Sequence, residues 1–138
     1  MLACRARKAS SSFASPIVAG GNAYFVNRVG VLYCADAENG KERWAERAGR
    51  SVWATPLAAG NRVYLFGRDG TTTVIRAGKE FEVLARNVLF ESDGATEDTG
   101  TSGAEALPTP GASVLYAAAV AGKRIIIRTG DRVYCVAE

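Results

Sequence analysis

The sequence contains no histidine among its 138 residues. A Ser-His-Asp or Cys-His catalytic arrangement, and any metal site ligated by histidine, is therefore excluded. Cysteine is scarce as well, because Cys4, Cys34 and Cys135 form an odd set without a Cys-x-x-Cys spacing. Such a set fits neither a disulfide framework nor a zinc site, so small buried thiols or thiols without a chemical role are expected. These absences remove much of hydrolase and zinc chemistry from consideration.

Long apolar runs and clustered charge are also missing. No stretch reaches the about 18 apolar residues that a membrane-spanning helix requires, so no membrane span is expected. The net charge is only +3, and beyond Arg5, Arg7 and Lys8 the basic residues alternate with acidic ones. This pattern provides no basic stripe for nucleic acid. A hydrophobic content of 48% indicates a globular chain with a core of its own.

An internal repeat organises the sequence. A shift of 40 residues places Ala14-Ser15-Pro16 on Ala54-Thr55-Pro56, and it brings further residues into register without a gap: Tyr24 on Tyr64, Arg28 on Arg68, and Gly30 on Gly70. A third copy follows, in which residues 121–128 match 59–66 and Val133-Tyr134-Cys135 matches Leu32-Tyr33-Cys34. The third copy lacks the Ser/Thr-Pro step and ends after its third predicted strand.

Each copy has the pattern of an antiparallel meander. Short runs of β-branched and aromatic residues are separated by Gly-Gly, Gly-Asn, Gly-Lys and Asp-Gly steps, which are typical of tight hairpin turns. The first copy predicts strands over 16–19, 23–26, 31–35 and 42–45. The runs AYFV, VYLF and RIIIR are apolar at consecutive positions, so both faces of each sheet are expected to be covered. We predict an all-β fold of stacked four-stranded antiparallel meanders, a partial β-propeller of about three blades. A β-sandwich is the alternative, but it does not require a fixed repeat.

The repeat also predicts the domain boundaries. We expect a remnant of a preceding blade or tail over 1–12, a first blade over 13–50, a second over 51–91, and an incomplete third over 114–138. Residues 92–113 are rich in Gly, Ser, Thr, Glu and Pro, which indicates a flexible surface insertion. Acidic residues in and beside it could form a contact element or bind calcium weakly, although their spacing is not that of an EF-hand: Glu91, Asp93, Glu97, Asp98 and Glu105.

The stretch from Tyr33 to Trp44, YCADAENGKERW, carries a family resemblance. It resembles the repeat signature of the pyrroloquinoline-quinone (PQQ)-type, quinoprotein alcohol dehydrogenase-like β-propellers, Tyr-Ala-x-Asp-x-x-Thr-Gly-Lys-x-x-Trp. The matching residues are Tyr33, Asp36, Gly40, Lys41 and Trp44, with Cys34 in place of Ala and Asn39 in place of Thr. The family includes PQQ- and calcium-dependent dehydrogenases and the outer-membrane assembly lipoprotein BamB. Its propellers have about eight blades, so the chain resembles a C-terminal fragment.

The resemblance implies a quinone site only in the dehydrogenase branch, and the residues argue against it. A vicinal Cys-Cys pair is absent, and Asp36, Asp69 and Asp131 lie in predicted turns without a calcium-loop spacing. The 40-residue shift aligns Trp44 with Leu84 and Asp36 with Arg76. A quinone site would not tolerate these replacements. We therefore expect Trp44 to pack against the neighbouring blade, and we expect neither PQQ, calcium nor enzymatic activity. Trp53, at a blade entrance, is a possible recognition residue.

The expected function is that of a non-catalytic protein-interaction or scaffolding fragment; the alternative is part of a quinoprotein dehydrogenase. Two uncovered end sheets should present Tyr24, Phe25, Ile125 and Ile126 outward, which favours association with further blades or a second copy. The resemblance implies an extracytoplasmic setting. Because Cys34 and Cys135 occupy equivalent positions in non-adjacent blades, no disulfide is expected between them.

Overall fold

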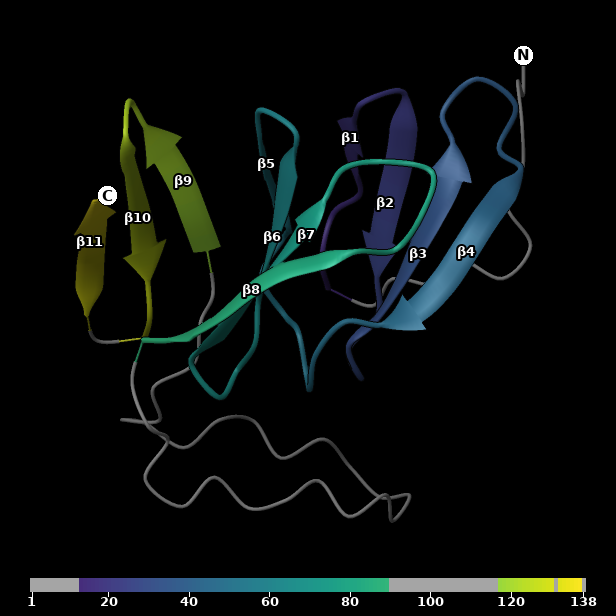
Figure 1. Cartoon of the computed structure of the whole chain (residues 1–138). Helices are drawn as coiled ribbons and strands as arrows, with labels where there is room; N and C mark the ends of the chain where they lie inside the picture. The colour runs from purple at the N-terminus through teal and green to yellow at the C-terminus, as the bar shows by residue number, and fades with distance from the viewer. Residues whose placement is uncertain (1–12, 90–116, 131, 138) are drawn as a thin grey trace, which may run out of the picture.

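The computed structural model describes residues 13–89, 117–130 and 132–137, and in this part of the chain the regular structure is entirely β (Figure 1). The first sheet is formed by β1 (Ile17–Ala19), β2 (Asn22–Val26), β3 (Val31–Asp36) and β4 (Glu42–Arg47). The second comprises β5 (Leu57–Ala59), β6 (Arg62–Phe66), β7 (Thr71–Arg76) and β8 (Val83–Val88). The third comprises β9 (Ala117–Ala121), β10 (Arg124–Arg128) and β11 (Val133–Ala137).

Every sheet is an antiparallel meander of consecutive strands, which confirms the predicted fold class. The first turn of each meander has a glycine with positive φ at the same place in the repeat: Gly20 at 55°, Gly60 at 57° and Gly122 at 60°. Residues with a Cβ rarely adopt this conformation, which explains why the repeat retains glycine there. The expected insertion over 92–113 and the segment 1–12 lie outside the described residues.

Strand pairing shows which residues of the copies are equivalent. Tyr24 faces Cys34 across β2 and β3, as Ile126 faces Cys135 across β10 and β11. The outermost strands do not follow the same shift, however, because Trp44 pairs with Cys34 whereas Ala85 pairs with Val74. The prediction that Leu84 replaces Trp44 is therefore wrong. The loop between β7 and β8 has one residue more than that between β3 and β4, which moves the counterpart to Ala85.

The three sheets stack in chain order around two cores (Figure 1). Alternate residues of β6 serve both cores, because Val63 and Leu65 pack toward the first sheet while Tyr64 and Phe66 pack toward the third. The second sheet is thus covered on both faces, as predicted. The first core also contains Ala14, Tyr24, Val26, Leu32, Cys34, Ala48, Val52 and Ile75; the second contains Ala54 and Ile127.

The end sheets are covered on one face only by described residues, and this corrects part of the prediction. Tyr24 was expected to face outward, but it is 0% exposed in the first core, and Ile125 packs against the second core. Consecutive residues of a strand point to opposite faces, so of the four predicted residues only Phe25 and Ile126 lie on the outer faces. Ile126 is 36% exposed.

No helix in the described part of the chain is long and apolar enough to cross a membrane.

Candidate functional site

Trp44 on β4 contacts the neighbouring sheet. Its indole lies 5.2 Å from the ring of Phe81, edge to face, and 6.0 Å from the ring of Tyr24, measured between centroids. Phe81 belongs to the loop between β7 and β8, which reaches across from the second sheet. Tyr24 is held to the same loop, since its hydroxyl accepts a hydrogen bond from the Gly78 amide at 2.9 Å. This aromatic cluster joins the first two sheets, which gives Trp44 a packing role.

The turn after Tyr33 is organised by Asp36. Its carboxylate accepts hydrogen bonds from the amides of Glu38 and Asn39, at 2.9 and 3.3 Å, and forms an ion pair with Arg43. The Glu38 amide is the main cause that lowers the pKa of Asp36, with Arg43 adding to it. In the second sheet the charges are reversed, because Arg76, the counterpart of Asp36, pairs with Glu82. The motif acidic residue therefore stabilises a turn.

The remaining motif residues have structural positions as well. Gly40 adopts a positive φ of 70°, and the carbonyl of Lys41 accepts a hydrogen bond from the Asp36 amide at 2.9 Å, which closes the turn. Tyr33 pairs with Phe25 on the outer face of the first sheet.

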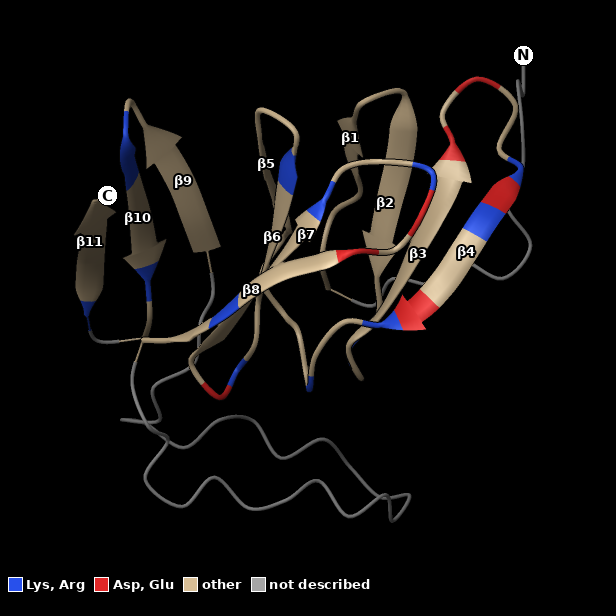
Figure 2. Cartoon of the chain, viewed as in Figure 1, with Lys and Arg blue, Asp and Glu red and all other residues tan. Residues whose placement is uncertain are grey.

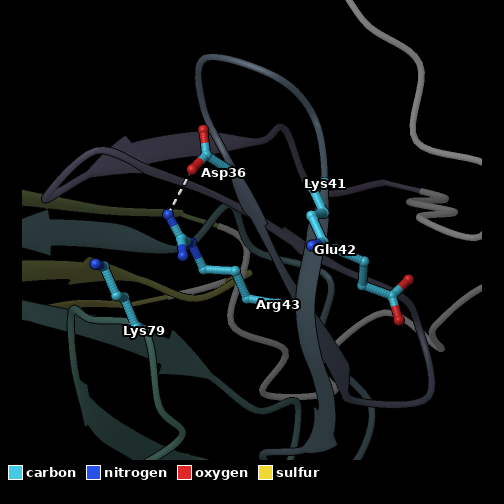
Figure 3. Close-up of a pocket in the computed structure, with 5 residues that line it drawn as sticks. All are labelled: Asp36, Lys41, Glu42, Arg43 and Lys79. Atoms are coloured by element: carbon cyan, nitrogen blue, oxygen red, sulfur yellow. Dashed lines mark hydrogen bonds and ion pairs between the residues drawn. The ribbon is translucent and has the colours of Figure 1, made fainter.

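A shallow pocket of about 310 Å³ lies beside this turn (Figure 3). Figure 3 shows Arg43 reaching Asp36, with Lys79 of the β7–β8 loop on the same side. Its lining is charged and contains no thiol or hydroxyl nucleophile: Asp36, Lys41, Glu42, Arg43 and Lys79. Within the strands, acidic residues occur in the first sheet only, whereas basic residues occur in all three sheets (Figure 2). The pocket is a polar groove between the first sheet and the β7–β8 loop.

The acidic side chains of the described residues are not gathered at one place. Residues 13–89, 117–130 and 132–137 contain no group of three or more Cys, Asp or Glu side chains that could hold a metal ion. Asp36 is engaged by its own turn, and Asp69 likewise accepts a hydrogen bond from the Thr71 amide at 3.0 Å. Asp131 lies outside the described residues.

Trp53 lies in a second cluster, at the entrance to the innermost strand of the second sheet. The strands β1, β5 and β9 are neighbours, so they form the inner edge of the stack. Phe13 precedes β1 as Trp53 precedes β5, and their rings lie 5.1 Å apart. The guanidinium carbon of Arg68 lies 4.2 Å from the centre of the Trp53 ring. The structure thus brings together an aromatic pair and a cation at one end of this edge.

The link between β4 and β5 fixes this cluster. The Val52 amide donates to the Arg28 carbonyl of the first sheet at 3.1 Å, and the Arg68 amide of the second sheet donates to the Ser51 carbonyl at 2.9 Å. Sequence reasoning identified Trp53 but missed Arg68 as its partner. The repeat could have drawn attention to Arg68. Arg28 and Arg68 are separated by the repeat length of 40 residues, as are Phe13 and Trp53.

The two described cysteines differ in environment. Both are free thiols, but Cys34 is buried between the first two sheets and Cys135 is exposed. Burial raises the pKa of Cys34 to about 11, whereas the Tyr24 hydroxyl and Arg43 act in the opposite direction. Cys34 should therefore remain protonated and unreactive where an exposed thiol reacts.

This difference predicts the labelling pattern. In a Cys4→Ser background at pH 8, a thiol reagent should modify Cys135 rapidly and Cys34 only upon unfolding, as followed by mass spectrometry. The folded state favours the neutral Cys34 thiol, so this stabilisation is complete below about pH 9 and declines as the pH rises toward 11. Equal labelling rates of the two thiols in the folded protein would contradict the position of Cys34.

These sheets define the class of protein: stacked antiparallel meanders of three or four strands, with their first strands at the inner edge, are the blades of a β-propeller. The family model that matches residues 5–133 is described as outer membrane protein assembly factor BamB. The chain therefore belongs to the BamB-type family of PQQ-like propeller repeats.

Comparison with solved structures agrees with this assignment. BamB from Moraxella catarrhalis is similar to 86% of the chain, with a TM-score of 0.55 and 18% identity, over 30% of the BamB chain. The quinohemoprotein alcohol dehydrogenase ADHIIG from Pseudomonas putida HK5 is similar to 94% of the chain, with a TM-score of 0.62 and 18% identity, over 19% of the enzyme. The computationally designed protein Ika4 is similar over 99% of this chain and 98% of its own, with a TM-score of 0.59 and 11% identity. Comparison with curated protein sequences gives no match.

The chain thus spans less than a third of the natural proteins that it resembles. At these identities the likeness concerns the fold.

Proposed function

We propose that the chain is a non-catalytic blade module that binds other proteins, or further blades, through the outer faces of its end sheets. The observation that carries the proposal is the difference between equivalent positions. Tyr24 in the first sheet is 0% exposed because the second sheet covers it, whereas its counterpart Ile126 in the third sheet is 36% exposed. An apolar position that is buried in one copy and exposed to solvent in another indicates a surface that another sheet could cover in the same way.

The charges on this surface favour a particular arrangement. Arg124 and Arg128 lie on either side of Ile126 along β10 and point to the same outer face. Two such faces would bring four guanidinium groups together, which disfavours a symmetric dimer through the third sheet. The outer face of the first sheet, with Phe25 and Tyr33, carries no such pair of cations on its central strands. We therefore propose head-to-tail contact, third sheet to first sheet.

Sedimentation velocity tests this proposal. The chain should form species larger than a monomer at tens of micromolar, and Ile126→Asp should raise the dissociation constant at least about tenfold because it places a carboxylate in an apolar contact. The matched control is Val88→Asp, since Val88 is 64% exposed on β8 and away from the outer face of the third sheet. A wild-type chain that remains monomeric at about 100 μM would contradict the proposal, as would an equal effect of the control.

The alternative role, part of a quinoprotein dehydrogenase, is equally compatible with the fold. It is supported by the likeness to the Pseudomonas putida enzyme. It would require carboxylate ligands from outside the described residues.

A further inference from the structure

We infer that Phe13, Trp53 and Arg68 form a binding site for an acidic side chain of a peptide. The site lies at the end of the stack where the innermost strands begin. The inference names a chemistry for the protein partner proposed above. Its site is separate from the outer faces of the end sheets.

The first observation concerns the unused capacity of Arg68. Its guanidinium lies over the Trp53 ring, and within the described part of the chain it has no carboxylate partner. Its Nε is buried without a hydrogen-bond acceptor among these residues. A buried donor without an acceptor is unfavourable, and an ionised acceptor satisfies it best. By contrast, Arg43 and Arg76 are both paired with acidic residues.

The second observation is preorganisation. The guanidinium carbon of Arg68 lies over the Trp53 ring, and the Arg68 amide is bonded to the Ser51 carbonyl, so the backbone position and the cation–aromatic contact exist before a ligand binds. A planar guanidinium held in this way presents its N–H groups to a carboxylate in a fork.

The third observation defines the neighbouring part of the ligand. Phe13 is 51% exposed and lies against Trp53, so it offers an apolar ring next to the cation. A carboxylate with an apolar group beside it matches this surface better than a bare anion. An acidic side chain followed by a large apolar residue in an extended peptide has this chemistry.

The test uses Trp53 as the reporter. In a Trp44→Phe background Trp53 is the remaining tryptophan, because the chain has two. The probes are the N-acetylated, C-amidated peptides Gly-Glu-Leu-Gly and Gly-Gln-Leu-Gly. The Glu peptide should change the Trp53 emission with a dissociation constant of about 1 mM, and the Gln peptide should bind roughly tenfold more weakly.

Variants of the cation separate binding from folding. Arg68→Gln should weaken the Glu peptide about tenfold, and Arg68→Lys should lose most of the affinity because it keeps the charge but not the planar fork. Lys79→Gln removes an exposed charge beside the pocket shown in Figure 3 and should leave peptide binding unchanged. Equal affinity for both peptides, an equal effect of Lys79→Gln, or no emission change at about 20 mM peptide would overturn the inference.

The outcome is distinguishable from that of the blade proposal. Ile126→Asp should weaken association of the chains at least about tenfold without altering peptide binding. If the chain binds the Glu peptide but does not associate, only the proposed contact between end sheets is contradicted. If the chain associates but does not bind the Glu peptide, only the carboxylate site is contradicted.

Discussion

Replacing Gly30 by alanine should lower the free energy of unfolding by about 3–5 kcal/mol, a loss at the upper end for a single substitution. Gly30 has a φ of 84°, which costs an L-residue roughly 1–2 kcal/mol. In addition, an added Cβ would lie 2.1 Å from the Arg50 carbonyl oxygen and 2.4 Å from that of Gly49. Because both neighbours are backbone atoms, the link between β4 and β5 would have to move.

That movement would break hydrogen bonds as well. The Gly30 carbonyl accepts the amides of Ala48 at 3.0 Å and Gly49 at 3.4 Å. Urea denaturation measures the loss. The matched control is Gly60→Ala, since Gly60 has a similar φ of 57° but nothing within 4 Å of an added Cβ. The control should cost only about 1–2 kcal/mol, and equal losses for the two variants would contradict the close approach at Gly30.

Trp44→Ala should lower the free energy of unfolding by about 2–4 kcal/mol. The substitution removes the ring that connects Tyr24 of the first sheet with Phe81 of the second, so it leaves a void between sheets. Trp44→Phe should retain about half of this stabilisation, because a smaller ring still reaches the cluster.

Leu84→Ala is the informative control for Trp44→Ala. Leu84 is the residue that the 40-residue shift aligns with Trp44, but it is 37% exposed on β8. Its removal should cost less than about 1 kcal/mol in the same urea experiment. A loss at Leu84 as large as that at Trp44 would show that the two residues are equivalent after all.

Much of the fold could be predicted because the repeated glycines mark the positions where the backbone needs a positive φ. The spacing of Gly20, Gly60 and Gly122 indicates the same tight turn in each copy, and the matches at 40 residues indicate stacked meanders. The counterpart of Trp44 could not be found by a constant shift, because the longer β7–β8 loop displaces only the last strand. The outward direction predicted for Tyr24 was wrong because apolar runs do not reveal which face meets the neighbouring sheet.

The candidate sites were less predictable. The sequence predicted that Trp44 packs and that Trp53 is a possible recognition residue, but the contact between Arg68 and Trp53 depends on the path of the β4–β5 link in three dimensions. The pairing of Arg68 with Trp53 is set by backbone hydrogen bonds to hairpins of two different sheets.

The β4–β5 link has a consequence for how the chain opens. It is bonded to the hairpins of both the first and the second sheet, and those sheets share the larger core. The third sheet contributes Ile127 to a core that contains only two other buried residues, Ala54 and Phe66, among those described. Local unfolding should therefore occur in two cooperative units. In hydrogen exchange, the amides of the first two sheets should exchange through one common opening. The amides of the third sheet should exchange at a lower free energy of opening, and more slowly when a partner covers this sheet.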